Sequence, residues 1–268
     1  MAQIQAQGAR SLPSALERLD EVRKAIEGRC PALFLDYDGT LTPIVAHPSE
    51  AVLPAATREV LIELSQRCAV AVISGRDLED VRRHIGIEGI FYAGSHGFQV
   101  AWPDGRRSEN EEATRLLPAL DVTERALGAG VAAVPGAWVE RKRFAIAVHY
   151  RQVADADVPA LERIVERVAE GSPGLYRSGG KRVFELRPDV DWHKGAVVTS
   201  LLEQLGLADG GLPIYIGDDL TDEDGFRAVA ETGIGIVVGA PGETAARYAL
   251  ADPAEVALFL DALLRAIE

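Results

Sequence analysis

Hydrophobic residues along this chain gather in short continuous runs, separated by stretches in which they recur at helical spacing. The runs lie at residues 32–35, 69–73, 90–93, 213–216 and 235–238. Uninterrupted runs of this length are typical of strands covered on both faces in a parallel sheet. The helical spacing falls at residues 54–68, 78–85, 193–205 and 222–231. Strands and helices in alternation predict right-handed βαβ units and an open, Rossmann-like α/β sheet.

Both ends of the chain carry further helical patterns. A helix is expected over residues 11–28, because Leu16, Leu19, Val22 and Ile26 repeat at helical spacing and Gly28 ends the pattern. We assign this helix a packing role, because it contains no residue pattern that suggests chemistry. Two more helices are expected after the last predicted strand.

The middle of the chain follows a different rhythm. After a turn signal at residues 102–105, a helix and two strands are expected twice, at residues 111–127, 138–141 and 144–150, and then at 159–170, 175–178 and 182–187. Gly179 and Gly180 are expected to form the hairpin turn between the last two strands. The alternation of apolar and polar residues within 144–150 predicts an antiparallel sheet with one face covered by the two helices. The sequence therefore predicts a core domain at residues 1–105 and 189–268, and an inserted α+β (αββαββ) domain at residues 106–188.

The composition is that of a globular protein. The 268 residues are 47% hydrophobic and 26% charged, enough to bury a core without a metal or a disulfide. Acidic residues outnumber basic ones by 41 to 28, which gives a formal net charge of −13. Nucleic acids and anionic membranes would be repelled by this charge. A small anionic substrate stays compatible with it, because a basic pocket or a bound cation reverses the field locally.

The sequence shows no targeting signal and no cysteine motif that would indicate a function. The first ten residues lack the apolar segment of a signal peptide, and no run approaches the ~18 apolar residues of a membrane span. Cys30 and Cys68 give neither a disulfide framework nor a zinc spacing, and both are expected to be buried free thiols. We therefore expect a soluble, cytoplasmic protein.

Two aspartates directly follow the first strand of the predicted sheet. Asp36 and Asp38 lie at its carboxyl end, where open α/β sheets bind their ligands. Two carboxylates this close repel one another, and Mg²⁺, a hard cation that prefers oxygen ligands, would neutralise them. One aspartate could then attack phosphorus while the other acts as a general acid. The simpler alternative is an Asx turn in which Gly39 supplies an unusual backbone angle.

A second acidic cluster follows the predicted strand 213–216. Asp218 and Asp219 come directly after this strand, and Asp222 and Glu223 begin the next helix. If the two strands are neighbours, these acids converge with the first pair and complete a cation site. Asp222 and Glu223 could instead only complement the helix dipole, the interpretation that we prefer for Glu223.

Two further residues fit the same edge of the sheet. Ser74 follows the predicted strand 69–73, where its hydroxyl and nearby backbone amides could hold a phosphoryl oxygen. It could also be a simple turn residue. Lys194 begins a helix, a position that the helix dipole disfavours, so an anionic partner is expected for it. A solvated surface lysine is the alternative.

Together these motifs resemble the haloacid dehalogenase superfamily of phosphohydrolases. The match comprises Asp-x-Asp-Gly-Thr at 36–40, Ser74, Lys194 and Gly-Asp-Asp-x-x-Asp at 217–222, in the order of the family. The longer sequence segments around these motifs, including Ser74-Gly75-Arg76, are similar to those of the trehalose-6-phosphate phosphatases. The resemblance covers residues 30 to 268 and implies that the inserted domain is the cap of a haloacid dehalogenase core.

The resemblance implies a role for each motif residue. Asp36 would be the nucleophile that becomes an aspartyl-phosphate. Asp38 would protonate the departing sugar oxygen and then activate water. Ser74 and Lys194 would hold the phosphoryl oxygens. The residues implied as ligands of Mg²⁺ are Asp36, Asp38 through its backbone carbonyl, and Asp218, with Asp219 and Asp222 in support.

The resemblance also implies that the cap selects the substrate. Charged residues on the predicted strands of the cap look like the sugar-binding residues of the family, namely Glu140, Lys142, Arg151 and Glu185, with Arg76 of the core as a further substrate contact. Without the resemblance, the residues of the cap could equally form the solvated face of a two-layer sheet.

The resemblance thus implies Mg²⁺-dependent hydrolysis of trehalose 6-phosphate to trehalose and phosphate. The expected partner is a small-molecule sugar phosphate, with no obligate protein partner evident. Another capped sugar phosphatase, for example one acting on sucrose phosphate, is the alternative within this class. A metal-dependent regulatory module without turnover is an alternative of another class, disfavoured because both Asp36 and Asp38 are present. A receiver domain also uses clustered aspartates, but the presence of the inserted domain argues against that class of protein.

Overall fold

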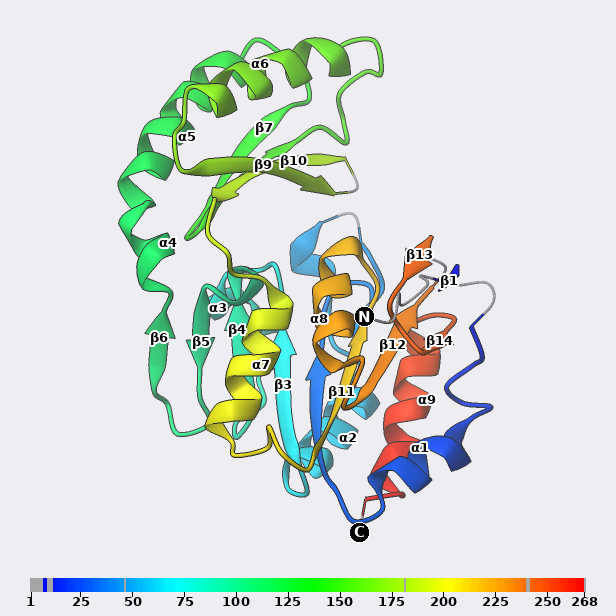
Figure 1. The fold of residues 1–268 in the computed structure, drawn as a ribbon. Helices are drawn as coiled ribbons and strands as arrows, with labels where there is room; N and C mark the ends of the chain where they lie inside the picture. The colour runs from blue at the N-terminus through cyan, green and yellow to red at the C-terminus, as the bar shows by residue number, and fades with distance from the viewer. Residues whose placement is uncertain (1–6, 9–11, 46, 181, 240–241, 268) are drawn as a thin grey trace. The chain divides into compact units, whose positions relative to one another are not determined.

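The computed structural model describes residues 7–8, 12–45, 47–180, 182–239 and 242–267. These residues divide into two compact units, which Figure 1 shows as ribbons. The larger unit comprises Met1–Arg107 and Trp192–Glu268, and the smaller one Ser108–Asp191. We refer to them as the core unit and the cap unit.

The core unit is built on an eight-stranded sheet with the order β14-β12-β11-β2-β3-β4-β5-β6. The first six strands in this order run parallel, so the predicted parallel sheet is confirmed. Their bounds are β2 Cys30–Leu35, β3 Ala69–Ile73, β4 Phe91–Gly94, β11 Gly211–Gly217, β12 Ile234–Val238 and β14 Tyr248–Leu250. Strand β5 (Gln99–Ala101) is antiparallel to β4, and β6 (Arg107–Glu109) is the far edge.

Helices cover both faces of this sheet. Successive residues of a strand point to opposite sides, and the apolar strands therefore present hydrophobic side chains on both faces. Leu33 and Leu35 of β2 pack in one apolar cluster, and Phe34 packs in another. In Figure 1, α7 and α8 lie in front of the sheet. Helices of the first cluster are α1 Leu19–Ile26, α2 Ala55–Ser65, α3 Leu78–Ile85 and α9 Pro253–Leu264; those of the second are α7 Lys194–Gln204 and α8 Glu223–Val229.

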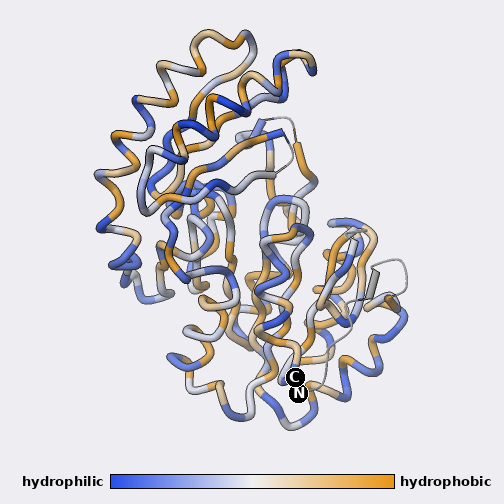
Figure 2. The backbone as a smooth tube through the Cα atoms, turned by 45° about the horizontal axis from the view of Figure 1, so that its top comes forward, coloured by the Kyte–Doolittle hydropathy of each residue, from blue (hydrophilic) through white to orange (hydrophobic). Residues whose placement is uncertain are grey.

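The cap unit is a four-stranded antiparallel sheet with the order β7-β8-β10-β9 and helices packed on one face. Its strands are β7 Trp138–Lys142, β8 Ala145–His149, β9 Leu175–Gly180 and β10 Val183–Pro188. Its helices are α4 Glu111–Arg115, α5 Leu117–Val131 and α6 Val158–Glu170. Hydrophilic and hydrophobic residues alternate along these helices in Figure 2, as expected for helices that bury one side.

Two details of the cap unit differ from the prediction. The helix expected over residues 111–127 is interrupted at Leu116, because Pro118 lacks an amide proton and fits only the first turn of a new helix, α5. Gly179 and Gly180 do not form the hairpin turn. They are the last paired residues of β9, opposite Phe184 and Val183.

The N-terminal helix is shorter than predicted. The expected first residue, Ser11, lies outside the described residues, and α1 begins only at Leu19. The preceding segment is held beside β14 instead, since the amide of Ala15 donates to the carbonyl of Ala249 at 3.0 Å. Val22 and Ile26 are buried in the core, which confirms the packing role of this helix.

The prediction of two helices after the last strand is partly wrong. Residues 248–250 extend the sheet as β14, and β13 (Glu243–Thr244) pairs with β1 (Gln7–Gly8). Among the described residues of this end, α9 is the single helix after β12. It begins where Pro253 follows Asp252, whose Oδ1 accepts hydrogen bonds from two amides of the first turn.

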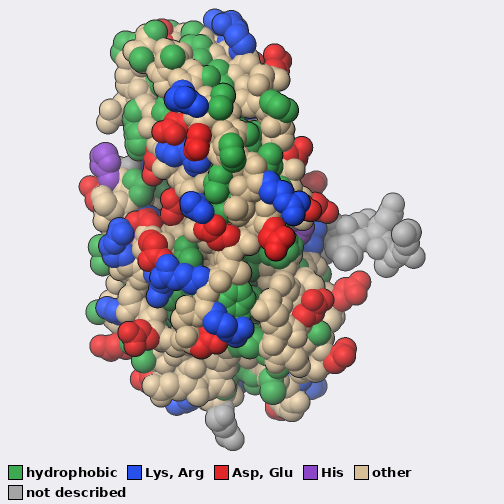
Figure 3. Space-filling model, turned by 90° about the vertical axis from the view of Figure 1, so that its left-hand side faces the viewer, with side chains coloured by type: hydrophobic (Ala, Val, Ile, Leu, Met, Phe, Trp, Pro, Cys, Tyr) green, Lys and Arg blue, Asp and Glu red, His purple; other side chains and the backbone are tan. Residues whose placement is uncertain are grey.

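The charged side chains of the surface are mixed in sign where Figure 3 shows them. On that face, acidic and basic side chains are intermingled. No helix in the described part of the chain combines the length and apolarity needed to cross a bilayer. Cys30 is exposed and Cys68 half-buried, so the expectation of two buried thiols is wrong, although burial raises the pKa of Cys68 to about 12.

Candidate active site

The acidic residues that follow two strands meet at the carboxyl edge of the core sheet. Strands β2 and β11 are neighbours, and the amide of Asp36 donates to the carbonyl of Ile216 at 2.9 Å. Carboxylate oxygens of Asp36, Asp218 and Asp222 all lie within 4.8 Å of one another. The first and second acidic clusters of the sequence therefore form one group.

Lys194 is the cation of this group. Its Nζ donates to Oδ1 of Asp36 and to Oδ1 of Asp222, both at 2.7 Å, and its side chain is only 3% exposed. Burial lowers the pKa of Lys194, but the two carboxylates outweigh burial and raise it above its usual value. The lysine is therefore charged at neutral pH, and a solvated surface position is ruled out.

Asp222 organises the loop that follows β11. Its Oδ1 also accepts from the hydroxyl of Tyr215 at 2.6 Å, and its Oδ2 accepts from the amides of Asp218 and Asp219 at 3.1 and 3.0 Å. Both oxygens of this fully buried carboxylate are thus engaged by protein donors. An interpretation of Asp222 as a mere helix charge is wrong, because the residue fixes the position of Lys194 and of the loop.

Two neighbours of Asp222 serve the same loop. Asp219 caps the short helix η4 (Leu220–Asp222), since its Oδ1 accepts from the amide of Leu220 at 2.7 Å. Glu223 is buried and its Oε2 accepts from the amide of Ala245 at 2.8 Å. Glu223 does lie in the first turn of α8, as the helix-charge prediction requires, and its side chain also ties α8 to the segment after β12.

Gly39 allows the loop after β2 to approach Asp218. Its φ is +97°, a left-handed conformation that favours glycine, as the Asx-turn alternative assumed. A Cβ atom at this position would collide with the carboxylate of Asp218. The turn thus serves the convergence of the acids and does not compete with it.

The electrostatics of this group favour a bound cation. Burial raises the pKa of Asp36 well above its usual value; Asp222 and Asp218 add to this effect, and Lys194 opposes it. Three carboxylates face one ammonium group, so negative charge is in excess when all are ionised. An oxygen-only ligand set with excess negative charge suits a hard divalent cation such as Mg²⁺.

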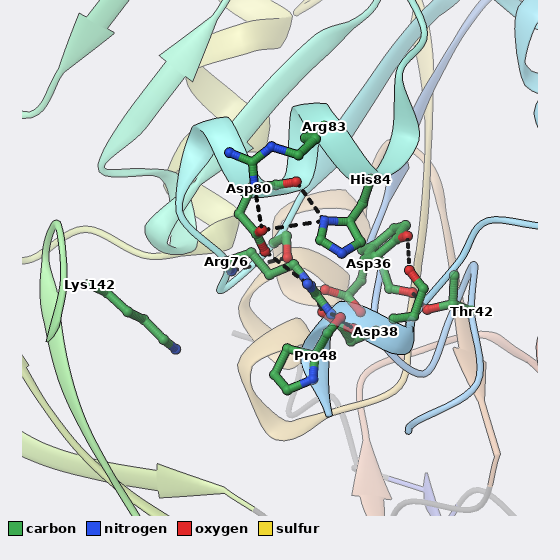
Figure 4. A network of polar contacts seen from close by, with 12 residues as sticks. Asp36, Asp38, Thr42, Pro48, Arg76, Asp80, Arg83, His84 and Lys142 are labelled. Atoms are coloured by element: carbon green, nitrogen blue, oxygen red, sulfur yellow. Dashed lines mark hydrogen bonds and ion pairs between the residues drawn. The ribbon is translucent and has the colours of Figure 1, made fainter. Parts of the chain in front are cut away.

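Ser74 lies at the same edge, at the end of β3 next to β2. The residue is buried, and its Oγ accepts from the amide of Arg76 at 3.2 Å. The side chain of Arg76 binds Asp38, with Nε and Nη2 donating to the two carboxylate oxygens at 2.6 and 2.7 Å (Figure 4). The structure thus brings the predicted residues Asp38, Ser74 and Arg76 together.

Sequence reasoning missed several residues of this region. Tyr215 reads as one more apolar strand residue, although its hydroxyl binds Asp222. His96, to which the motifs gave no role, has a φ of +58°, and its ring occupies the space that a Cβ at Gly75 would need. The flanking Gly94 and Gly97 were the available signal for this unusual turn.

In the cap unit, three predicted residues lie on the sheet face that carries no helices. Val139 packs in the core beneath the helices, so Glu140 and Lys142 point to the opposite face. Glu185 lies on that face too, and Nζ of Lys142 donates to its Oε1 at 2.9 Å. Arg151 lies beyond the end of β8 and is exposed, so it does not belong to the strand face.

Trp138 and His149 complete this face of the cap, and the sequence did not point to either. Their rings are stacked, with centroids 3.9 Å apart, and Trp138 is 48% exposed. Nε2 of His149 lies 2.7 Å from Oε2 of Glu140, and this hydrogen bond lowers the pKa of Glu140. Ala147 of β8 is paired with Glu140 of β7 on one side and with Glu185 of β10 on the other, so a small side chain separates the two carboxylates.

Comparison with known proteins assigns the chain to a family. The family model of trehalose-phosphatase matches residues 34–254, from strand β2 to the start of α9. This chain belongs to the trehalose-phosphatase family. The resemblance stated from the motifs is thereby confirmed.

Relatives differ in how much longer they are than this chain. The trehalose-phosphate phosphatase of Mycobacterium tuberculosis is 44% identical over 260 residues, which are 95% of this chain and 66% of that protein. An uncharacterized glycosyl hydrolase of the same species is 45% identical over 261 residues, which are 94% of this chain and 20% of that protein. The chain thus spans about two thirds of one relative and a fifth of the other.

Solved structures share the architecture. A trehalose-6-phosphate phosphatase related protein has a TM-score of 0.77 and 29% identity, covering 87% of this chain and 97% of its own. A haloacid dehalogenase-like hydrolase from B. subtilis has a TM-score of 0.55 at 17% identity, covering 86% of this chain and 98% of its own, so it shares the fold alone. The predicted fold class, an α/β core of the haloacid dehalogenase type, is confirmed.

Proposed function

We propose that this protein hydrolyses trehalose 6-phosphate to trehalose and inorganic phosphate. The observation that carries the proposal is the buried group of Asp36, Lys194 and Asp222 at the carboxyl edge of a parallel sheet. It occurs in a chain whose relatives are named trehalose-phosphate phosphatases. Phosphoryl transfer requires positioned charges more than covalent machinery, and this group supplies them.

The first step forms a phosphoenzyme. A carboxylate oxygen of Asp36 attacks phosphorus and the bond from phosphorus to the sugar oxygen breaks, while Asp38 donates a proton to that oxygen. Trehalose leaves and an aspartyl-phosphate remains on Asp36. In the second step Asp38 removes a proton from water, whose oxygen attacks phosphorus, and the bond to Asp36 breaks. Phosphate is released and both carboxyl groups return to their starting forms.

The residues present fit a divalent cation. We assign its binding to Asp36, the backbone carbonyl of Asp38 and Asp218, since the oxygens of Asp222 are already engaged by protein donors. Mg²⁺ would supply charge neutralisation between the Asp36 carboxylate and the phosphoryl group. Asp222 and Asp219 act in support by fixing the loop after β11.

Two further residues serve the phosphoryl group in this proposal. Lys194, already charged and buried, attracts the phosphoryl oxygens while keeping its contact with Asp36. Ser74, at the end of the neighbouring strand, offers its hydroxyl to the same oxygens. Both positions are fixed by buried contacts, so little reorganisation is needed when substrate binds.

Sugar recognition belongs to the helix-free face of the cap unit in this proposal. Glu140 and Glu185 offer carboxylate acceptors for sugar hydroxyls, and Lys142 offers donors. Arg151 contributes from the end of β8.

A phosphate-release assay over a panel of sugar phosphates tests the proposal. With Mg²⁺ present, trehalose 6-phosphate should be hydrolysed with the highest kcat/KM, and chelation followed by restored Mg²⁺ should abolish and restore turnover. A higher kcat/KM for sucrose phosphate or glucose 6-phosphate would overturn the substrate assignment alone. Absence of turnover on every substrate would overturn the enzymatic proposal and favour a regulatory module.

A further inference from the structure

One guanidinium group lies between the proposed general acid and helix α3 (Figure 4). Arg76 follows the end of β3, and its side chain is only 8% exposed. Besides its two hydrogen bonds to Asp38, Nη1 donates to Oδ2 of Asp80 at 2.8 Å. Nη2 also donates to the carbonyl of Pro48 at 2.8 Å. One buried cation thus links a loop carboxylate to a helix carboxylate.

These contacts occupy both edges of the guanidinium plane. The pair of bonds to Asp38 is bidentate, a geometry that fixes the orientation of a carboxylate as well as its distance. The ring of Tyr37 lies beneath the group, with Cζ of Arg76 5.3 Å from the ring centroid. A guanidinium engaged in this way has little capacity left for a sugar hydroxyl.

Asp80 is itself held in place. Its Oδ1 lies 3.5 Å from Nη1 of Arg83 of α3. Nδ1 of His84, on the same helix, lies 2.8 Å from the backbone carbonyl of Asp80 and 3.4 Å from Oδ1. The other carboxylate oxygen of Asp80, Oδ2, faces Arg76 and accepts the hydrogen bond from Nη1, as Figure 4 shows. A rigid helix therefore orients Asp80, which orients Arg76, which orients Asp38.

We propose that Arg76, oriented by Asp80, is a positioning residue for Asp38 and not a ligand of the sugar. This inference rests on the proposed function, in which Asp38 transfers the proton. Proton transfer needs the carboxyl oxygen within hydrogen-bond reach of the leaving oxygen. The Asp38 side chain is 38% exposed on a loop, and the bidentate clamp restricts the rotamers that it samples.

The substitution Arg76→Lys tests this role, because an ammonium group cannot bind a carboxylate in a bidentate fashion. For trehalose 6-phosphate, kcat should fall about ten- to a hundredfold while KM changes less than about threefold, as expected when an interaction of the transition state alone is lost. For p-nitrophenyl phosphate the fall should stay below about threefold, because a phenolate leaves without a proton. A raised KM for trehalose 6-phosphate with an unchanged kcat would overturn the inference and favour sugar binding.

A double-mutant cycle sharpens the test. If Arg76 acts through Asp38, then Arg76→Lys should cost almost nothing further in an Asp38→Asn background. Multiplicative losses in the double variant would overturn the inference. Asp80→Asn should reproduce the selective loss on trehalose 6-phosphate in milder form, and it replaces Arg76→Lys in the cycle if that variant does not fold.

Arg82→Lys is the matched control. Arg82 lies on α3, the helix that carries Asp80, but it pairs with Glu79. It should match the unsubstituted protein on both substrates. Failure of the inference and failure of the proposed function give different results. If the unsubstituted protein does not hydrolyse trehalose 6-phosphate, the proposed function fails. If it does, and the losses in the double variant are multiplicative, only the role of Arg76 is overturned.

Discussion

Replacement of Lys194 by methionine removes the ammonium group that binds Asp36 and Asp222 in the buried acidic group, while most of the side-chain volume is kept. Lys194 donates to Asp36 and Asp222 at 2.7 Å, with its side chain only 3% exposed. Loss of one partner from a buried ion pair costs about 3–5 kcal/mol, because a charge is left uncompensated. Two lost hydrogen bonds to charged groups, at roughly 1.5–3 kcal/mol each, give a similar sum. We expect Lys194→Met to lower the free energy of unfolding by about 3–5 kcal/mol at pH 8.

The dependence of this loss on pH identifies its cause. Burial already raises the pKa of Asp36 in the folded state, and removal of Lys194 takes away the main opposing interaction. A carboxyl group whose folded pKa lies above its unfolded value binds more protons when folded, so stability falls as pH rises between the two values. The deficit of Lys194→Met should therefore be large at pH 8 and smaller at pH 5, where the carboxyl groups accept protons.

Urea denaturation at both pH values, in chelator and with constant ionic strength, measures the effect. Lys24→Met is the matched control, because Lys24 is an exposed lysine of α1. Its effect should stay within about 0.5 kcal/mol at either pH. A deficit of Lys194→Met that is equal at pH 5 and pH 8, or below about 1 kcal/mol at both, would refute the charge argument and leave only a packing effect.

Three further outcomes are expected. Asp36→Asn should keep the fold, as judged by its thermal midpoint, and lose essentially all phosphate release, because an amide cannot form the acyl phosphate; substantial residual turnover would exclude the covalent route. Gly39→Ala should weaken Mg²⁺ activation measured by titration, since its Cβ would displace the Asp218 carboxylate; an unchanged Mg²⁺ midpoint would contradict the role of this close approach. Glu140→Gln should lower kcat/KM for trehalose 6-phosphate about tenfold or more, with p-nitrophenyl phosphate hydrolysis unchanged; equal losses on both would indicate damage to the cap and not to sugar recognition.

The convergence of the acids was predictable because it depends on local pattern and one topological rule. Apolar runs that end in Asp36 and Asp218 place both residues at the carboxyl edge of a parallel sheet. Their actual partners were not predictable. Tyr215 and Asp222 meet because β11 and the following turn fold back on one another, and no periodicity in the sequence encodes that contact.

Errors in the fold have equally specific causes. Helical spacing before Leu19 was overridden by backbone pairing with β14, a contact between residues at opposite ends of the chain. Arg76 differs from expectation too, because the resemblance implied that it contacts the substrate. Two carboxylates occupy its guanidinium group instead: Asp80, four residues further along the chain, and Asp38, 38 residues before it. Side-chain charge indicated that these residues would be bound, but only the tertiary structure identifies the partner.

The order of strands in the core sheet has a consequence for synthesis of the chain. Strand β2, which carries Asp36, lies between β3 and β11, and β11 is made only after the whole cap segment. A nascent chain that ends at Asp191 therefore exposes one edge of β2, an apolar strand with unpaired backbone groups. The cap segment has its own apolar cluster and is continuous in sequence, so it is able to fold first. Catalytic competence is therefore among the last properties that the emerging polypeptide acquires, and chains arrested within the cap segment are expected to depend on chaperones.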